Sequence, residues 1–98
     1  MKKLNLSFAC WDYDRTRALQ DGRVAVDGID LNYLNLPVEE TFYRQARFQE
    51  FDISEMSLSS YCVGLARAKA QGVPSPFVAL PIFPSRFFRH SCIYVNAD

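Results

Sequence analysis

The stretch Leu4-Asn5-Leu6-Ser7-Phe8-Ala9-Cys10 decides the fold class, because apolar side chains alternate along it with small or polar ones. This period of two predicts a β-strand over residues 3–10. The alternation recurs over residues 29–33, and residues 51–53 read Phe-Asp-Ile, a third and very short strand. Helical patterns separate these strands, and this order is typical of α/β proteins.

Three helices are predicted, and each has a recognisable start. Asp12 or Asp14 can cap a first helix over residues 15–20. Pro37 suits the first turn of a second helix, which runs to residue 49. The third helix, over residues 57–70, has the clearest 3.6-residue periodicity in the chain. The residues expected to face inward are Val38, Phe42 and Ala46 in the second helix and Leu58, Tyr61, Cys62, Leu65 and Ala66 in the third.

Two further strands are predicted after the third helix. Residues 77–83 form a nearly continuous apolar run, which is typical of a strand covered on both faces, and Pro81 implies an edge position or a bend there. Residues 91–95 form the last predicted strand. The fold class is therefore α/β, with three layers, a largely parallel sheet and helices on both of its faces. No helix remains to cover the last strand, so we expect the chain to be part of a larger protein.

Composition and charge exclude several functions. The chain has 98 residues, enough for one domain, and 11 basic residues balance 11 acidic ones, so neither nucleic acid nor an anionic membrane is an expected partner. No apolar run approaches the ~20 residues of a membrane span, and no signal peptide is predicted. The 3 cysteines are far apart, which favours reduced thiols in the cytoplasm over disulfides or a zinc site.

Polar segments follow the predicted strands where α/β proteins bind ligands, at the carboxyl ends of the strands. Residues 10–15 follow the first strand and residues 55–60 follow the third. The alternative is structural: the carboxylates and serines cap helices or fill a first turn, and the tryptophan belongs to the core. The candidates in these two segments are Trp11, Asp12, Asp14, Ser57 and Ser59.

A third segment, residues 84–91, joins the last two predicted strands. It places Arg86, Arg89 and the single histidine, His90, around two phenylalanines. Guanidinium groups bind carboxylates in a bidentate manner, and aromatic walls suit a planar ring. The alternative is a solvated turn whose histidine has an ordinary hydrogen-bond partner. Glycine-rich phosphate loops and metal-spaced histidines are absent from the sequence, so we predict no organic cofactor and assign no residue as a metal ligand.

Four blocks of sequence carry a family resemblance. They read ACWDYDRTR at residues 9–17, LNLPVEETF at 34–42, EMSLSSY at 55–61 and FPSRFFRHS at 83–91. In this order they resemble the N-terminal part of the 4,5-dihydroxyphthalate decarboxylase family, and the resemblance covers essentially the whole chain. It implies a type II periplasmic-binding-protein-like fold, in which a ligand lies between two α/β lobes. Residues 1–98 would then be most of lobe one, without the second lobe and the segment that returns to lobe one.

The resemblance also implies an activity, the conversion of 4,5-dihydroxyphthalate to protocatechuate in the degradation of aromatic compounds. Decarboxylation of an arene requires a proton on the carbon that loses carbon dioxide, and His90 is our candidate carrier of that proton. Arg86 and Arg89 are candidates for a clamp on the second carboxylate. Asp12 and Asp14 are candidate acceptors for the ring hydroxyls. Ser57 and Ser59 are candidate donors to a carboxylate at a helix N-terminus, and Trp11 is a candidate wall of the pocket.

Two alternatives to this activity stay open. A solute-binding protein of the same fold would capture a small carboxylic acid without chemistry. Alternatively, the 98 residues alone have no activity. In either case the expected ligand is a small aromatic dicarboxylate or a related acid, and we expect self-association of the chain through uncovered apolar strands.

Overall fold

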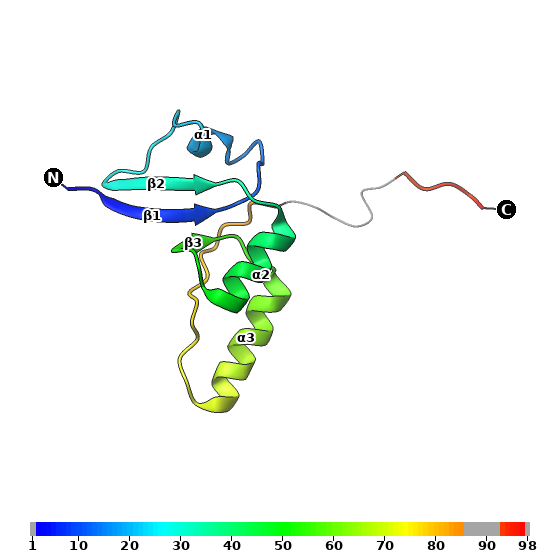
Figure 1. The fold of residues 1–98 in the computed structure, drawn as a ribbon. Helices are drawn as coiled ribbons and strands as arrows, with labels where there is room; N and C mark the ends of the chain where they lie inside the picture. Colours follow the sequence, from blue (N-terminus) through cyan, green and yellow to red (C-terminus); the bar gives the residue numbers. More distant parts are fainter. Residues whose placement is uncertain (1, 86–92, 98) are drawn as a thin grey trace.

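The computed structural model describes residues 2–85 and 93–97. Three strands and three helices alternate in this part of the chain (Figure 1). The predicted order of strands and helices up to residue 71 is therefore confirmed. The elements are β1 (Leu4–Ala9), α1 (Arg17–Gln20), β2 (Ile29–Leu34), α2 (Val38–Phe48), β3 (Ile53–Ser54) and α3 (Leu58–Gln71).

The described strands form one parallel sheet in the order β2-β1-β3. The pairing of β1 with β2 runs from Leu4 opposite Ile29 to Ala9 opposite Leu34. The chain crosses the sheet in one direction from β1 to β2 and in the other from β2 to β3. Right-handed crossovers then place α1 and α2 on opposite faces, and Figure 1 shows α1 beside β2, with α2 and α3 beside β3. This arrangement is compatible with the predicted three-layer α/β fold.

The third strand is one residue shorter than predicted, because it begins two residues later and ends one residue later. Both backbone groups of Phe51 bind the side chain of Gln45, with its N–H donating to Oε1 at 3.0 Å and its carbonyl accepting from Nε2 at 3.1 Å. The next backbone N–H, of Asp52, donates to the hydroxyl of Ser7 at 2.9 Å. Side chains thus satisfy the backbone groups that a longer strand would have paired, and only Ile53 and Ser54 join the sheet.

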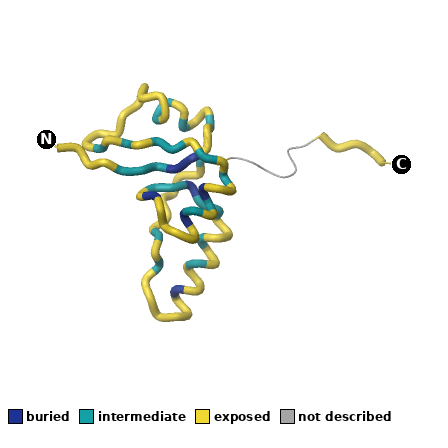
Figure 2. The backbone as a smooth tube through the Cα atoms, viewed as in Figure 1, coloured by how far each residue is buried: buried dark blue, intermediate teal, exposed yellow. Residues whose placement is uncertain are grey.

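The buried core within the described residues is small and partly polar (Figure 2). Helix α2 buries Thr41 and Gln45, whereas Ala46, predicted to face inward, is exposed. The contact of Gln45 with Phe51 accounts for this difference, because it fixes which side of α2 lies against the start of β3. The fully or nearly buried residues are Ala9, Cys10, Thr41, Gln45, Phe51, Glu55 and Ala68.

Helix α3 confirms the predicted boundaries but not the predicted buried face. Ser57 caps it by accepting a hydrogen bond from the Ser60 N–H, and Gly72 ends it with a left-handed φ of 68°. Ala68 is its buried residue, and Tyr61 is half-buried. The rest of the periodic stripe is exposed, because no described element packs over it: Leu58, Cys62, Leu65 and Ala66.

The predicted strand over residues 77–83 is wrong. This segment has no regular structure, and Val78 is 89% exposed. Pro81 lacks an N–H for a strand ladder, and around it the Ile82 N–H donates to the Leu80 carbonyl at 2.8 Å, which bends the chain. Of the last predicted strand, Ser91 and Cys92 lie outside the described residues, and residues 93–95 are not in a strand. None of the described helices is long and apolar enough to cross a membrane.

Candidate functional site

The carboxyl ends of β1 and β3 meet at the topological switch point of the sheet. The connection after β1 leads to β2 on one side, and β3 lies on the other side of β1. Ligands of open α/β sheets bind in the crevice at such a point. Two backbone hydrogen bonds hold the strand ends together just beyond the sheet: Glu55 N–H to the Ala9 carbonyl at 3.0 Å, and Cys10 N–H to the Leu34 carbonyl at 3.1 Å.

Glu55 is the buried charged residue of this edge, only 8% exposed. Its Oε1 accepts from the Trp11 N–H at 2.8 Å, and its Oε2 accepts from the Tyr13 hydroxyl at 2.8 Å. Sequence reasoning included Glu55 in a polar segment but assigned it no role. The signal available was a carboxylate placed directly after a strand, at the switch point, where a charge is buried only with hydrogen-bond donors.

The side chain of Tyr13 contacts Glu55, Ser85 and Arg15 at this edge. Burial and the hydrogen bond to Glu55 raise the pKa of Tyr13 to about 12, while Ser85 acts on the same hydroxyl in the opposite direction. Tyr13 is therefore a protonated hydrogen-bond donor at neutral pH. The guanidinium of Arg15 lies over its ring, 5.7 Å from the centroid.

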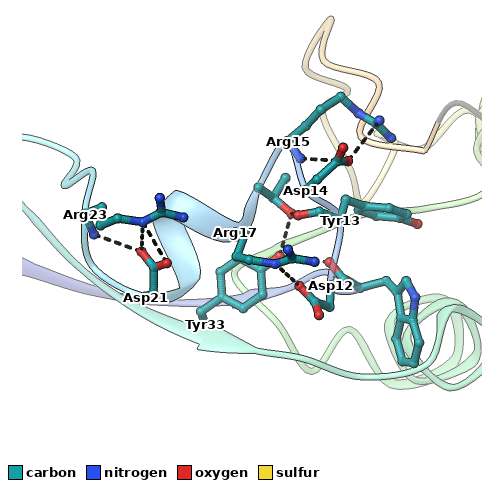
Figure 3. A network of polar contacts seen from close by, with 10 residues as sticks. Asp12, Tyr13, Asp14, Arg15, Arg17, Asp21, Arg23 and Tyr33 are labelled. Carbon is teal, nitrogen blue, oxygen red and sulfur yellow. Dashed lines mark hydrogen bonds and ion pairs between the residues drawn. The ribbon is translucent and has the colours of Figure 1, made fainter.

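Tyr33 supports the loop from β2. Its hydroxyl donates to the Trp11 carbonyl at 2.9 Å and lies 2.9 Å from the Thr16 hydroxyl, and burial raises its pKa (Figure 3). Its ring packs edge-to-face on Phe8 at 5.1 Å. Cys10 lies beneath this loop with no exposed surface, and burial raises the pKa of its thiol. A buried, protonated thiol is a poor nucleophile, so Cys10 is a packing residue.

Asp12 and Asp14 lie in the same loop, where the sequence placed them, but neither caps α1. Asp12 forms an ion pair with Arg17 at 3.2 Å, and Asp14 forms one with Arg15 at 3.4 Å (Figure 3). The helix consequently starts at Arg17, two residues later than predicted. Both carboxylates are exposed, so each still has oxygen lone pairs for a ligand donor.

Arg15 connects this loop to the segment that follows α3. Its Nε and Nη2 donate to the Pro84 carbonyl at 3.1 and 2.5 Å. The start of the arginine-rich segment therefore lies beside the loop after β1. The predicted site residues Arg86, Arg89 and His90 themselves lie outside the described residues.

Ser57 and Ser59 lie together at the start of α3. Their hydroxyls are 2.8 Å apart, and Ser57 accepts from the Ser60 N–H at 3.4 Å. The capping alternative is thus correct for Ser57, although a helix N-terminus retains other free N–H groups. Ser59 also lines a shallow groove formed mainly by α3 and residues 75–77.

No group of three or more histidine, cysteine, aspartate or glutamate side chains could hold a metal ion in the part of the chain that the structure describes.

Two curated proteins are similar to the whole chain. No protein-family model matches the chain. A 4,5-dihydroxyphthalate decarboxylase of Comamonas testosteroni is 49% identical over all 98 residues, which are 28% of its length. A 4,5-dihydroxyphthalate decarboxylase of Pseudomonas putida is 47% identical over the same 98 residues, 36% of its length. The predicted resemblance to 4,5-dihydroxyphthalate decarboxylases is confirmed.

The similarity to the two decarboxylases includes every segment of the candidate site. Because it extends over all 98 residues, the loop after β1, the start of α3 and residues 83–91 all lie in the matched region. The chain spans about a third of the length of these curated relatives.

Proposed function

We propose that the protein to which this chain belongs removes one carboxylate from 4,5-dihydroxyphthalate and releases protocatechuate. The observation that carries this proposal is the similarity of the whole chain to two proteins named 4,5-dihydroxyphthalate decarboxylase. Since the chain spans about a third of those relatives, we further propose that it is part of one lobe and that a second lobe supplies the rest of the site.

The chemistry of the reaction assigns the tasks. A proton must reach the ring carbon that loses carbon dioxide, and the second carboxylate must be held so that this carbon stays in place. We propose His90 as the proton carrier and Arg86 with Arg89 as the clamp. The contact of Arg15 with Pro84 supports a location of these residues near the switch point, because Pro84 lies two residues before Arg86 in the sequence.

The described part of the edge offers complementary groups. Trp11 is 40% exposed, and its indole is a surface on which an aromatic ring can stack. The carboxylates of Asp12 and Asp14 can accept from ring hydroxyls, and the start of α3, with Ser57 and Ser59, can donate to a carboxylate. We propose that no organic cofactor takes part and assign no metal ligand, and the free thiols of Cys10 and Cys62 support a cytoplasmic location.

A direct assay tests this function. The purified natural protein that carries the chain is mixed with 4,5-dihydroxyphthalate, without additives, and product formation is followed by absorbance. Turnover is expected. Tight binding without turnover would favour the solute-binding alternative, and neither binding nor turnover would contradict both functions.

Four arginine variants test the clamp in the same assay. Arg86→Ala and Arg89→Ala should each weaken substrate binding by more than about tenfold, because a carboxylate would lose its charged partner. Arg44→Ala and Arg67→Ala are the matched controls, since Arg44 of α2 pairs with Glu40 and with Glu50, and Arg67 is exposed on α3. Equal, small effects in all four variants would contradict the clamp.

A further inference from the structure

The buried carboxylate of Glu55 has neutral hydrogen-bond partners in the part of the chain that the structure describes. Among residues 2–85 and 93–97, no lysine or arginine lies within ion-pair distance of it. Its stabilisation comes from the Trp11 N–H and the Tyr13 hydroxyl, one on each oxygen. Burial of a charge is costly, and the residues that compensate for it are two aromatic residues of the loop after β1.

These contacts fix the backbone of Trp11 on both sides. Its N–H is held by Glu55, and its carbonyl accepts from the Tyr33 hydroxyl at 2.9 Å and from the Tyr13 N–H at 3.0 Å. Trp11 as a whole nevertheless remains 40% exposed. A solvent-facing aromatic surface on a fixed backbone is a pre-organised platform for a planar ligand.

Tyr13 lies two residues from Trp11 and presents a polarised hydroxyl. The proton of this hydroxyl is committed to Glu55, so its oxygen acts toward other groups as an acceptor. Donation to a carboxylate oxygen strengthens that acceptor through the shared hydrogen-bond chain. Ser85 already acts on this oxygen and lowers the pKa of Tyr13, as a hydroxyl donor does, so the oxygen is within reach of donors from outside the loop.

We propose that Tyr13 determines specificity by accepting a hydrogen bond from a ring hydroxyl of the substrate stacked on Trp11, and that Glu55 is a positioning residue that acts through Tyr13. This assignment rests on the proposed function and deepens it. It distinguishes a dihydroxylated ring from a plain phthalate, because only the former carries the hydroxyl that Tyr13 accepts.

Paired ligands on the natural protein test the assignment. Binding of 4,5-dihydroxyphthalate and of phthalate is measured by titration for the wild type, Tyr13→Phe, Glu55→Gln and the double variant. Glu39→Gln, on the exposed side of α2, is the matched control for the loss of a carboxylate. Circular dichroism confirms that each variant is folded.

Tyr13→Phe is expected to weaken binding of 4,5-dihydroxyphthalate about tenfold, the value of one hydrogen bond, and to change binding of phthalate less than twofold. Glu55→Gln should show the same selective loss, and the double variant should lose little more, because the two residues act in one chain. Glu39→Gln should bind both ligands as the wild type does. An equal loss for both ligands, or none, would overturn the assignment while leaving the decarboxylase proposal intact.

The failure of the function itself has a different signature. A wild-type protein that neither binds nor turns over 4,5-dihydroxyphthalate would overturn the function and, with it, this assignment. An unfolded Glu55→Gln variant leaves the test to Tyr13→Phe, whose selectivity between the two ligands decides the role of the hydroxyl.

Discussion

The loop after β1 and the segment after α3 are both irregular, yet they differ in how they are held. In the loop, residues 10–16, backbone and side-chain groups bind Glu55, Tyr33 and Leu34. In the segment, residues 77–83, the large apolar side chains Val78, Leu80, Ile82 and Phe83 are between 60% and 89% exposed. Polar partners close in space thus fix an irregular loop, whereas an apolar run needs a covering layer before it becomes a strand.

The largest expected effect is a loss of stability, and it depends on the difference in burial between the residues packed beside the sheet and the segment after α3. Phe51, two residues before β3, is 6% exposed, and the guanidinium of Arg44 lies over its ring. Phe51→Ala should lower the free energy of unfolding by about 3–5 kcal/mol, because it leaves a cavity. Phe83→Ala, at a side chain 67% exposed, should cost less than ~1 kcal/mol. Urea denaturation measures both, and similar losses would mean that the segment is covered in solution.

The pH dependence of stability reports on the loop. The pKa of Tyr13 in the folded chain is about 12, above the ordinary value of 10.0. Between these values the unfolded chain loses its proton first, so stability is complete below pH 10 and falls as pH rises toward 12. Part of this loss is attributable to Tyr13, whose pKa is raised by burial first and then by the hydrogen bond to Glu55. Tyr13→Phe should remove this part of the loss in urea titrations from pH 8 upward, and Tyr43→Phe, on the exposed side of α2, is the control.

Self-association tests the exposed apolar segment, residues 77–83. We expect the 98-residue chain alone to associate through the apolar side chains of residues 77–83, since burying each such side chain contributes roughly 1.5–3 kcal/mol. Leu80→Lys combined with Ile82→Lys should weaken association at least about tenfold. Sedimentation over a range of protein concentrations measures it. Val24→Lys, at an exposed site near α1, should not change it, and a wild-type chain that sediments as a monomer would contradict the expectation.

The smallest expected effect concerns the start of α3. Ser57→Ala should lower the free energy of unfolding by ~1 kcal/mol, because it removes the helix cap, and Ser57→Asp should restore it. Ser59→Ala should have almost no effect on stability. Thermal unfolding followed by circular dichroism separates these variants, and a loss at Ser59 equal to that at Ser57 would contradict the capping role.

The sequence predicted the elements whose signals are local. Strand alternation placed β1 and β2, and the serine cap with the closing glycine placed α3 within one residue at each end. The boundary of β3 depended on the Gln45 side chain, and the buried side of α2 depended on the same contact. Such side-chain competition for backbone groups leaves no periodic signal in a sequence.

The sequence predicted where the candidate site lies but not which of its side chains pair with one another. Residues 10–15 and 55–60 do meet at the switch point, as parallel strands require. The pairing of Asp12 with Arg17, and the burial of Glu55, depend on how the loop folds back over the sheet. The strand over residues 77–83 failed because hydrophobicity alone predicted it, whereas Pro81 and the absence of a described covering layer decided against it.

The buried thiol of Cys10 makes it possible to measure how often this edge of the sheet opens. Cys10 has no exposed surface, whereas Cys62 is exposed on α3. An alkylating reagent should modify Cys62 at the rate of a free thiol and reach Cys10 only when the end of β1 separates from its neighbours. The rate of alkylation at Cys10, read by mass spectrometry, therefore counts how often this end of the sheet opens, and a ligand that closes the crevice should slow it.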